Sequence, residues 1–341
     1  MASEVPFIAD FLSNRQQFVS LHSTKSEKLP ITCGVPQGST LSPLLFLLYI
    51  NDVVNVSSHL KFILFADDTS AFIRGKDLNQ TTATLNCELS KLHAWLCRNK
   101  LSLNIQKTHY MAFNCRNNGP PLCIDSHPID LVSDTMFLGV KIDSNLVWDK
   151  HIKMIKFKIS KNIGAISKSR HLLNRSTLIT LYYSFVFPYL FYCIDVWGKA
   201  ASSHLNSLHR LQKLSCRLIL NVPPRTGSRP LFNSLKFLSI FEIYSYSVSL
   251  SLYKLHHGLL PPLFSALFTF RSSISSYSSS SRQNSYLDIP SFRTSFSQRT
   301  LKYTAAILWN KLIRIPSFSF SCSQASFKRK MKFHLMSQST Q

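Results

Sequence analysis

Two adjacent aspartates, Asp67 and Asp68, close a run of five apolar residues from Phe62 to Ala66. The run is short and rich in aromatic and branched side chains, which predicts a buried strand. Buried charge is costly unless it is paired or binds a metal, so this strand end is a candidate site for a divalent cation. Neighbouring side chains of a flat strand point to opposite faces, so a shared site needs a tight turn, which Thr69 and Ser70 could help to form. A turn with a purely structural role is the alternative.

A second motif, the segment Gly34-Val-Pro-Gln-Gly-Ser39, comes before this one and is followed by an apolar helix. Two glycines around a Pro-Gln step indicate a loop whose backbone must approach something closely. Ser39 or Ser42 can cap the helix, and Pro43 suits its first turn. The amide of Gln37 offers a donor and an acceptor to a base or a sugar. Alone, this loop is a weak signal for a nucleotide site.

Together the two motifs resemble a reverse transcriptase, specifically one from a non-LTR (LINE-type) retrotransposon. In that family the Gly-Val-Pro-Gln-Gly-Ser segment holds template and incoming nucleotide, and a (Phe/Tyr)-Ala-Asp-Asp hairpin supplies metal-binding carboxylates. Further matches occur in the right order, and the resemblance covers nearly the whole chain. The further matching segments are residues 14–17 for the helix before the nucleotide loop, residues 95–104 with Lys107 and Thr108 for the next palm motif, and residues 137–143 for the primer-grip turn.

The resemblance implies a role for each matching residue. Asp67 would bind metal and Asp68 would support or complete the site, with Mg²⁺ as cofactor and Mn²⁺ as its substitute. Lys107 would lie near the departing pyrophosphate as donor or counter-charge. The remaining roles would fall to Gly34, Pro36, Gln37, Gly38 and Ser39 at the nucleotide and template, and to Phe137, Leu138 and Gly139 at the primer end. The implied partners are an RNA template, a DNA primer and deoxynucleotides.

One expected element has no match. The family's first catalytic aspartate lies in a strand upstream of the helix matched by residues 14–17, and Asp10 falls in that helix instead. Carboxylates must bridge both ions in a two-metal site, and Mg²⁺ demands near-ideal octahedral geometry. We therefore expect an N-terminally truncated reverse transcriptase with little or no polymerase activity alone. The alternatives are a catalytically silent nucleic-acid-binding remnant of a retroelement and, less favoured, a basic membrane-associated protein.

Basic charge is concentrated in the second half of the chain. Residues 1–149 carry 12 basic and 13 acidic residues, whereas residues 150–341 carry 27 and 3. This asymmetry indicates a nucleic acid or an anionic membrane as partner. Five isoleucines between positions 152 and 166 recur every three or four residues and predict an amphipathic helix. Its basic side would track the nucleic-acid backbone through Lys150, Lys153, Lys156, Lys158 and Lys161.

Combined with the resemblance, the periodicities predict an α+β fold, in which a partial polymerase palm with an antiparallel sheet precedes mainly helical parts. The expected parts are a palm over 1–145, a basic helical thumb over 146–222, a helical region over 223–270, a Ser-rich linker over 271–298 and a short basic helical segment over 299–341. Within the palm, helices are expected near 5–20, 40–51 and 78–98, and strands near 61–66, 69–74, 109–114 and 136–142.

A strongly apolar stretch from Leu178 to Val196 approaches the roughly 20 residues that a membrane span requires. Pro188 within it and Asp195 at its edge favour a buried helix pair broken at Pro188, and we expect no stable membrane association. The start of the chain lacks the features of a secretory signal, so the expected location is intracellular, in the nucleus or the cytoplasm. The basic cluster at 328–332 fits nuclear targeting or, slightly better, a solvated tail.

Overall fold

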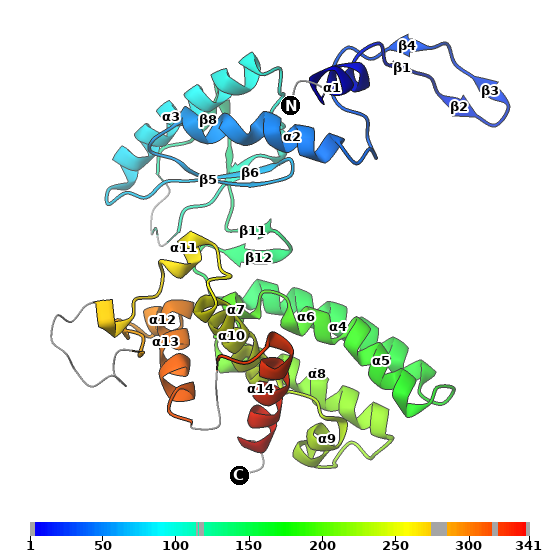
Figure 1. Ribbon diagram of the computed structural model, residues 1–341, viewed down its shortest axis with the longest axis vertical. Helices are drawn as coiled ribbons and strands as arrows, with labels where there is room; N and C mark the ends of the chain where they lie inside the picture. Colours follow the sequence, from blue (N-terminus) through cyan, green and yellow to red (C-terminus); the bar gives the residue numbers. More distant parts are fainter. Residues whose placement is uncertain (1–3, 114, 116–118, 274–284, 316–319, 339–341) are drawn as a thin grey trace. The chain divides into compact units, whose positions relative to one another are not determined.

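Figure 1 shows a computed structural model of the chain, which describes residues 4–113, 115, 119–273, 285–315 and 320–338. The chain divides into two compact units, Met1–Val132 and Ser133–Gln341, which we call unit 1 and unit 2. Small antiparallel sheets occur together with many helices, so the predicted α+β class is confirmed.

Unit 1 begins with a short helix and two small hairpins. These elements are α1 (Glu4–Leu12), β1 (Gln16–Gln17) paired with β4 (Leu29–Pro30), and β2 (Ser20–Leu21) paired with β3 (Thr24–Lys25). The expected helix over 5–20 is wrong beyond Leu12, because Asn14 adopts a left-handed φ of 53° that ends helical geometry. The segment 14–17 therefore follows the helix instead of forming part of it.

The rest of unit 1 is built around a small core. Its main elements are α2 (Ser42–Ile50), η1 (Asn51–Val56), β5 (Lys61–Phe65), β6 (Asp68–Phe72) and α3 (Leu78–Arg98). The helix expected over 78–98 is confirmed to the residue, and the Asp77 side chain caps it by accepting the Gln80 N–H at 2.7 Å. The buried core consists of Ile50, Val53, Leu89, Leu92, Leu122, Ile124 and Ile129. Phe62 and Leu64 of β5 pack against it, which holds the β5–β6 hairpin on α2 and α3.

The prediction that β5 is a buried strand is wrong. Among the described strands β5 pairs with β6 alone, and this sheet has two strands. Phe62 and Leu64 point inward, while Ile63 and Phe65 on the other face are 46% and 60% exposed. An apolar run predicts a strand, but burial of both its faces also requires neighbours on both sides.

Unit 1 ends in short elements. They are η2 (Ile105–Lys107), β7 (His109–Tyr110), β8 (Cys123–Ile124), β9 (His127–Pro128) and β10 (Asp130–Leu131). β8 and β9 form an antiparallel hairpin, and β10 pairs in parallel with β7. The strand expected over 109–114 is therefore shorter than predicted, and residue 114 itself lies outside the described residues.

Unit 2 opens with the hairpin of β11 (Asp134–Phe137) and β12 (Val140–Asp143). The single strand expected over 136–142 is wrong, because the chain reverses at Leu138 and Gly139. This hairpin packs on α4 (Asp149–Ser169), the helix expected from the isoleucine repeat, whose five isoleucines are all buried. The compact units thus divide before the hairpin, whereas the predicted palm includes it.

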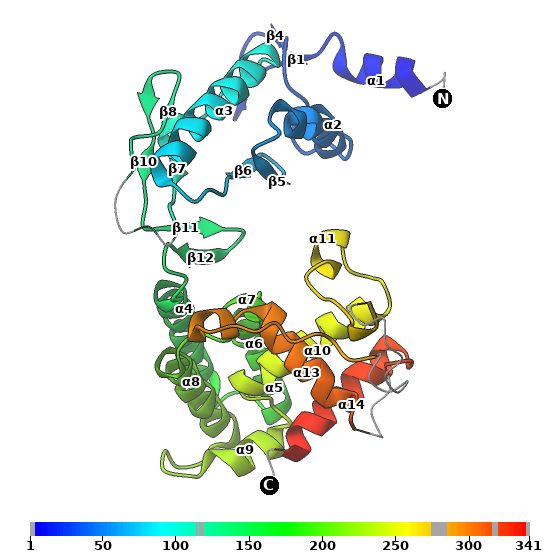
Figure 2. The ribbon, with the colours of Figure 1, turned by 90° about the vertical axis from the view of Figure 1, so that its left-hand side faces the viewer.

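The remainder of unit 2 is helical, as expected. The elements are α5 (Arg175–Phe185), α6 (Phe187–Phe191), α7 (Ile194–Trp197), α8 (Ser202–Leu220), α9 (Ser228–Leu235), α10 (Ile240–His256), α11 (Pro262–Ser265), η3 (Arg271–Ser273), α12 (Ser295–Gln298), α13 (Leu301–Leu312) and α14 (Gln324–Gln338). α4 packs along α8, and α10 contacts α13 and α14 (Figure 2). The predicted helix pair is confirmed: α5 ends before Val186, and Pro188 lies in the first turn of α6. No described helix combines the length and apolar character of a membrane span.

Two expectations for the C-terminal part change. Residues 274–284 of the predicted Ser-rich linker lie outside the described residues, but Leu287, further along that predicted linker, is fully buried. Its backbone exchanges two hydrogen bonds of 2.9 Å with the Asn310 side chain on α13. The basic cluster at 328–332 is part of α14, where Phe327 and Met331 are buried, so the prediction of a tail is wrong, whereas Lys328, Arg329 and Lys330 are exposed to solvent as predicted.

Candidate active site and nucleic-acid surface

Asp67 and Asp68 lie at the tight turn of the β5–β6 hairpin. Phe65 pairs with Asp68, so Ala66 and Asp67 form a two-residue turn, and Ala66 has a φ of 51°. The turn that two neighbouring carboxylates require is therefore present. The sequence had indicated that Thr69 and Ser70 help to form this turn. They do not, because both residues pair with β5.

Both carboxylates are exposed, and neither has a hydrogen-bond or ion-pair partner among the described residues. Within that part of the chain, no group of three His, Cys, Asp or Glu side chains comes together as a metal site would require. Carboxylate oxygens are the ligands that Mg²⁺ prefers, and proteins often bind it through one or two carboxylates plus water and substrate phosphates. The chemistry of this pair fits a Mg²⁺ site that the substrate helps to complete.

The loop of Gly34 to Ser39 is held against the start of α2. The Ser42 hydroxyl donates to the Pro36 carbonyl at 2.6 Å, and the Ser39 hydroxyl accepts the Leu41 N–H at 3.2 Å. The expectation that Ser39 or Ser42 caps α2 is wrong, because Leu41 occupies the cap position without a side-chain bond. Pro43 lies in the first turn, as predicted.

Gly34 and Gly38 have φ values of 80° and 86°, and an added Cβ at either position would meet nothing within 4 Å. The positive φ of both residues therefore favours glycine. The sequence had suggested that another group comes close to the backbone of this loop, but no described neighbour does. Gln37 between them is exposed. Arg15 anchors the loop: its guanidinium donates to the Leu12 carbonyl at 2.9 Å and to the Gly34 carbonyl at 2.5 Å. Sequence reasoning had assigned Arg15 to a helix and missed this contact.

Lys107 ends the short helix η2 in unit 1. The Asn104 side chain accepts the Lys107 N–H at 3.1 Å and so fixes the backbone there. The Lys107 side chain is exposed, and no described hydrogen bond or ion pair joins it to Asp67 or Asp68. Its role near a pyrophosphate remains a prediction.

Phe137, Leu138 and Gly139 lie at the turn of the β11–β12 hairpin in unit 2. Leu138 and Gly139 both have positive φ, 45° and 80°. The Tyr192 hydroxyl donates to the Leu138 carbonyl at 2.6 Å, and an added Cβ on Gly139 would lie 3.3 Å from the Tyr192 ring. The turn is thus attached to the segment that follows α6.

A second set of contacts links Tyr192 back to strand β12 of this hairpin through Trp197 and His151. The Trp197 indole N–H donates to the Tyr192 carbonyl at 2.9 Å, and its ring meets His151 edge-on with centroids 5.4 Å apart. The Nδ1 atom of His151 accepts the N–H of Lys141 on β12 at 3.1 Å. We call Tyr192, Trp197 and His151 the hairpin clamp. Burial lowers the pKa of His151 to about 4, which keeps its ring neutral at physiological pH.

The five lysines predicted to track nucleic acid are all exposed on α4, but they differ in their partners. Lys150 forms an ion pair with Asp134, which also binds Lys141 at 2.7 Å, and together these ammonium groups hold the pKa of Asp134 well below its usual range. Lys153 pairs with Asp149 at 2.8 Å. Lys158 lies over the Tyr189 ring, 5.6 Å from its centroid. Lys156 and Lys161 have no partner among the described residues.

Beyond Asp134 and Asp149, which pair with lysines of β12 and α4, three other acidic residues of unit 2 stabilise local structure. Asp143 accepts the N–H groups of Val147 at 3.0 Å and Trp148 at 2.8 Å. Asp195 is half-buried, and desolvation raises its pKa; its carboxylate accepts the Ser251 hydroxyl at 2.8 Å. Glu242 forms a capping box with Ser239 at the start of α10. The excess of Lys and Arg in unit 2 is therefore left to face solvent or an anionic partner.

Comparisons with known proteins agree with these features. Residues 2–142 match the family model described as reverse transcriptase (RNA-dependent DNA polymerase). The chain is 29% identical over 244 residues to the probable RNA-directed DNA polymerase from transposon X-element of Drosophila melanogaster, which covers 69% of this chain and 27% of that protein. It is also 29% identical over 240 residues to the RNA-directed DNA polymerase from mobile element jockey of the same species, covering 67% and 26%.

A third relative, the probable RNA-directed DNA polymerase from transposon BS of Drosophila melanogaster, is 28% identical over 271 residues, which covers 74% of this chain and 30% of that protein. Residues 2–142 thus match a reverse transcriptase domain, and the chain is similar to the RNA-directed DNA polymerases of non-LTR retrotransposons. It spans less than a third of the length of each of these three relatives.

Proposed function

We propose that this chain is part of an RNA-directed DNA polymerase of a non-LTR retrotransposon, and that Asp67 and Asp68 are its metal ligands. The two-residue turn that presents both carboxylates without a competing partner is the observation that carries this proposal. The family match over residues 2–142 and the loop of Gly34 to Ser39 upstream of the turn support it.

In this proposal Asp67 and Asp68 would hold Mg²⁺, with Mn²⁺ as a substitute, and the ion would supply positive charge to the phosphates in nucleotidyl transfer. Gly34, Gln37 and Gly38 shape the surface for template and nucleotide, and Lys107 offers positive charge to the departing pyrophosphate. The turn of Leu138 and Gly139, rigidly attached to Tyr192, positions the primer end.

Primer extension on an RNA template with a DNA primer tests the catalytic role. In the complete polymerase of such an element, we expect Asp67→Asn to lower extension in Mg²⁺ by at least about 100-fold, because even outer-shell changes around metals cost 10–100-fold. Asp125→Asn is a matched control, since Asp125 lies in another tight turn of the same unit, between β8 and β9.

The control should keep full activity, which separates the loss of a metal ligand from the loss of a surface charge. Equal activity of Asp67→Asn and the native polymerase would remove Asp67 from the metal site. For the 341-residue chain alone we expect no extension, because two carboxylates leave a two-metal site incomplete.

Nucleic-acid binding without synthesis is the second candidate function, and the unpaired positive charge of unit 2 favours it. Neutralisation of phosphates by Lys and Arg gives an affinity that falls as salt rises. Duplex binding that is salt-sensitive and independent of Mg²⁺, together with an inactive complete polymerase, would support this candidate over the first.

A further inference from the structure

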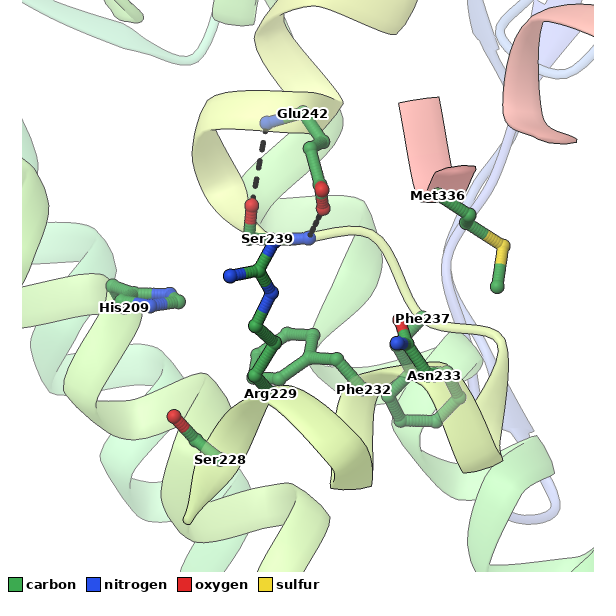
Figure 3. A pocket seen from close by; sticks show the side chains of 9 residues that line it. All are labelled: His209, Ser228, Arg229, Phe232, Asn233, Phe237, Ser239, Glu242 and Met336. Atoms are coloured by element: carbon green, nitrogen blue, oxygen red, sulfur yellow. Dashed lines mark hydrogen bonds between the residues drawn. The ribbon is translucent and has the colours of Figure 1, made fainter. Parts of the chain in front are cut away.

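Unit 2 contains a pocket of about 330 Å³ that none of the roles above uses. It lies where α8, α9, the first turn of α10 and the end of α14 meet (Figure 3). The volume is in the range of sites that bind small molecules. The side chains that matter for its chemistry are His209, Arg229, Phe232, Asn233, Phe237 and Met336.

The pocket has rigid aromatic walls. Phe232 and Phe237 are 7% and 2% exposed, and Phe237 stacks on the buried Tyr182 ring with centroids 4.1 Å apart. His209 packs against Phe232 with centroids 5.6 Å apart. Because these rings are held by the core, the pocket is formed before any ligand arrives.

Arg229 and Asn233 offer hydrogen-bond donors to the pocket. Arg229 extends from α9 toward Ser239 in Figure 3, and no described hydrogen bond or ion pair engages its guanidinium. The Asn233 amide is likewise without a described partner. Glu242, the one carboxylate among the described residues that line the pocket, accepts the Ser239 N–H at 2.6 Å and so belongs to the capping box.

Further cations flank the wall formed by Phe237 and Met336. Lys236 directly precedes Phe237, and Lys332 lies one turn before Met336 on α14. The Lys332 ammonium lies 3.4 Å from the Tyr183 hydroxyl, and the Tyr183 ring meets Phe237 with centroids 5.4 Å apart. None of the described carboxylates pairs with Lys236 or Lys332. An aromatic slot beside unpaired cations suits a planar ligand that carries negative charge.

We propose that this pocket binds one unpaired nucleotide of a nucleic-acid strand. The base contacts the small parts of Phe232 and Phe237 that face the pocket, the Asn233 amide meets its edge, and Arg229 contacts the adjoining phosphate. Sequence-tolerant binding of single strands commonly combines contacts to aromatic side chains with a basic surface. The inference rests on the proposed function only in taking nucleic acid as the polymer that unit 2 binds.

Fluorescence anisotropy with the full 341-residue chain tests whether the pocket binds an unpaired nucleotide. The probes are a labelled single-stranded RNA of 12 nucleotides and a blunt RNA–DNA duplex of the same sequence. We expect Arg229→Ala to weaken single-strand binding about tenfold, because the charge-assisted hydrogen bond of its guanidinium to the phosphate is lost. Arg225→Ala removes the same charge from the loop that leads into α9 but does not line the pocket, and it should change the affinity by less than about twofold. Duplex affinity should be equal in the two variants.

Photo-crosslinking locates the nucleotide directly. A 4-thiouridine in the RNA should attach to peptides that contain Phe232, Phe237 or Met336, and the attachment should disappear in Arg229→Ala. Competition by uridine monophosphate would show that the pocket accepts a free nucleotide, and its failure to compete would show that it accepts only the strand.

Equal weakening by Arg229→Ala and Arg225→Ala, or crosslinks only elsewhere, would overturn the pocket while leaving nucleic-acid binding intact. Binding of neither probe by the native chain would overturn the nucleic-acid partner and the pocket together. Displacement of the RNA by polyglutamate from the native chain, with direct polyglutamate binding that Arg229→Ala loses, would identify a site for acidic peptides instead.

Discussion

Gly139 combines two constraints in one residue. Its φ of 80° favours glycine, and an added Cβ would lie 3.3 Å from the Tyr192 ring that holds the neighbouring carbonyl. Gly34 and Gly38 share the positive φ but border open space. The turn of β11–β12 is therefore fixed by packing as well as by its own backbone, which is what positioning a primer end would demand.

Substitution of Gly139 tests this packing. We expect Gly139→Ala to lower the free energy of unfolding of unit 2 by about 1–2 kcal/mol, the cost of a left-handed conformation for a residue with a Cβ. Gly164→Ala is the matched control, since Gly164 lies within α4 with nothing near its Cβ position, and it should stabilise by about 0.5–1 kcal/mol. Urea unfolding followed by tryptophan fluorescence measures both. The same sign for the two changes would contradict this account of the turn.

His151 makes the stability of unit 2 depend on pH. Its pKa is about 4 in the folded chain and about 6.5 when unfolded, so the unfolded state binds more protons between these values. Stability from this residue is fully present above pH 6.5 and is lost as pH falls toward 4, by about 2 kcal/mol at pH 5. We expect His151→Gln to flatten that part of the profile, whereas a change at the exposed His171 should not. An unchanged profile in His151→Gln would show that His151 is not kept neutral by burial.

At the scale of elements, α4 shows how one helix serves two purposes. Its isoleucines build the core of unit 2, and its lysines form the opposite face. Lys150 and Lys153 are already bound to Asp134 and Asp149, so they tie the helix to its surroundings. Lys156 and Lys161 are free among the described contacts and are the better candidates for binding phosphates.

A pair of double variants separates these purposes. Lys156→Ala with Lys161→Ala should lower duplex affinity and reduce the slope of log K against log salt by about two, roughly 0.9 for each phosphate that is no longer neutralised. Lys150→Ala with Lys153→Ala should change that slope less, because in the free protein their charges are offset by Asp134 and Asp149. Equal slopes for both double variants would show that the ion pairs open on binding.

Elements with a long, regular pattern could be predicted from the sequence. α3 agrees with its predicted range, and α4 forms where the isoleucine repeat predicts a helix, because apolar spacing marks both helices locally and the Asp77 cap fixes the start of α3. The β5 and β6 strands were also predicted, but the exposure of Ile63 and Phe65 was not, because burial depends on which neighbours a strand finds. The hairpin clamp lay beyond sequence reasoning: Leu138 and Tyr192 are 54 positions apart, and no local pattern links them.

At the scale of the molecule, the two units differ in how much apolar surface they bury. Unit 1 has the small core described above, while unit 2 buries a single large cluster that includes Ile159, Trp197 and Phe327. Hydrophobic stabilisation grows with apolar area removed from water. Unit 1 also leaves Phe65, Leu48 and other large apolar side chains exposed.

This difference predicts the order in which the chain is digested. Under limited proteolysis we expect cleavage within unit 1 first and survival of fragments that begin near Ser133, because local opening of unit 1 costs less free energy. Mass spectrometry of the early fragments identifies the cut sites. Early cuts within α4 or α10 would contradict the assignment of stability to unit 2.

The central claim, that the Asp67–Asp68 turn holds the metal of a reverse transcriptase, is tested most directly by cleavage with bound iron. Fe²⁺ in place of Mg²⁺, with an RNA–DNA duplex and a deoxynucleotide present, is oxidised by added hydrogen peroxide and yields hydroxyl radicals that cut the polypeptide close to the ion. We predict cuts concentrated around residues 64–70, suppressed by excess Mg²⁺ and absent in Asp67→Asn but not in Asp125→Asn. Cuts that are spread along the chain, or that persist unchanged in Asp67→Asn, would contradict the assignment.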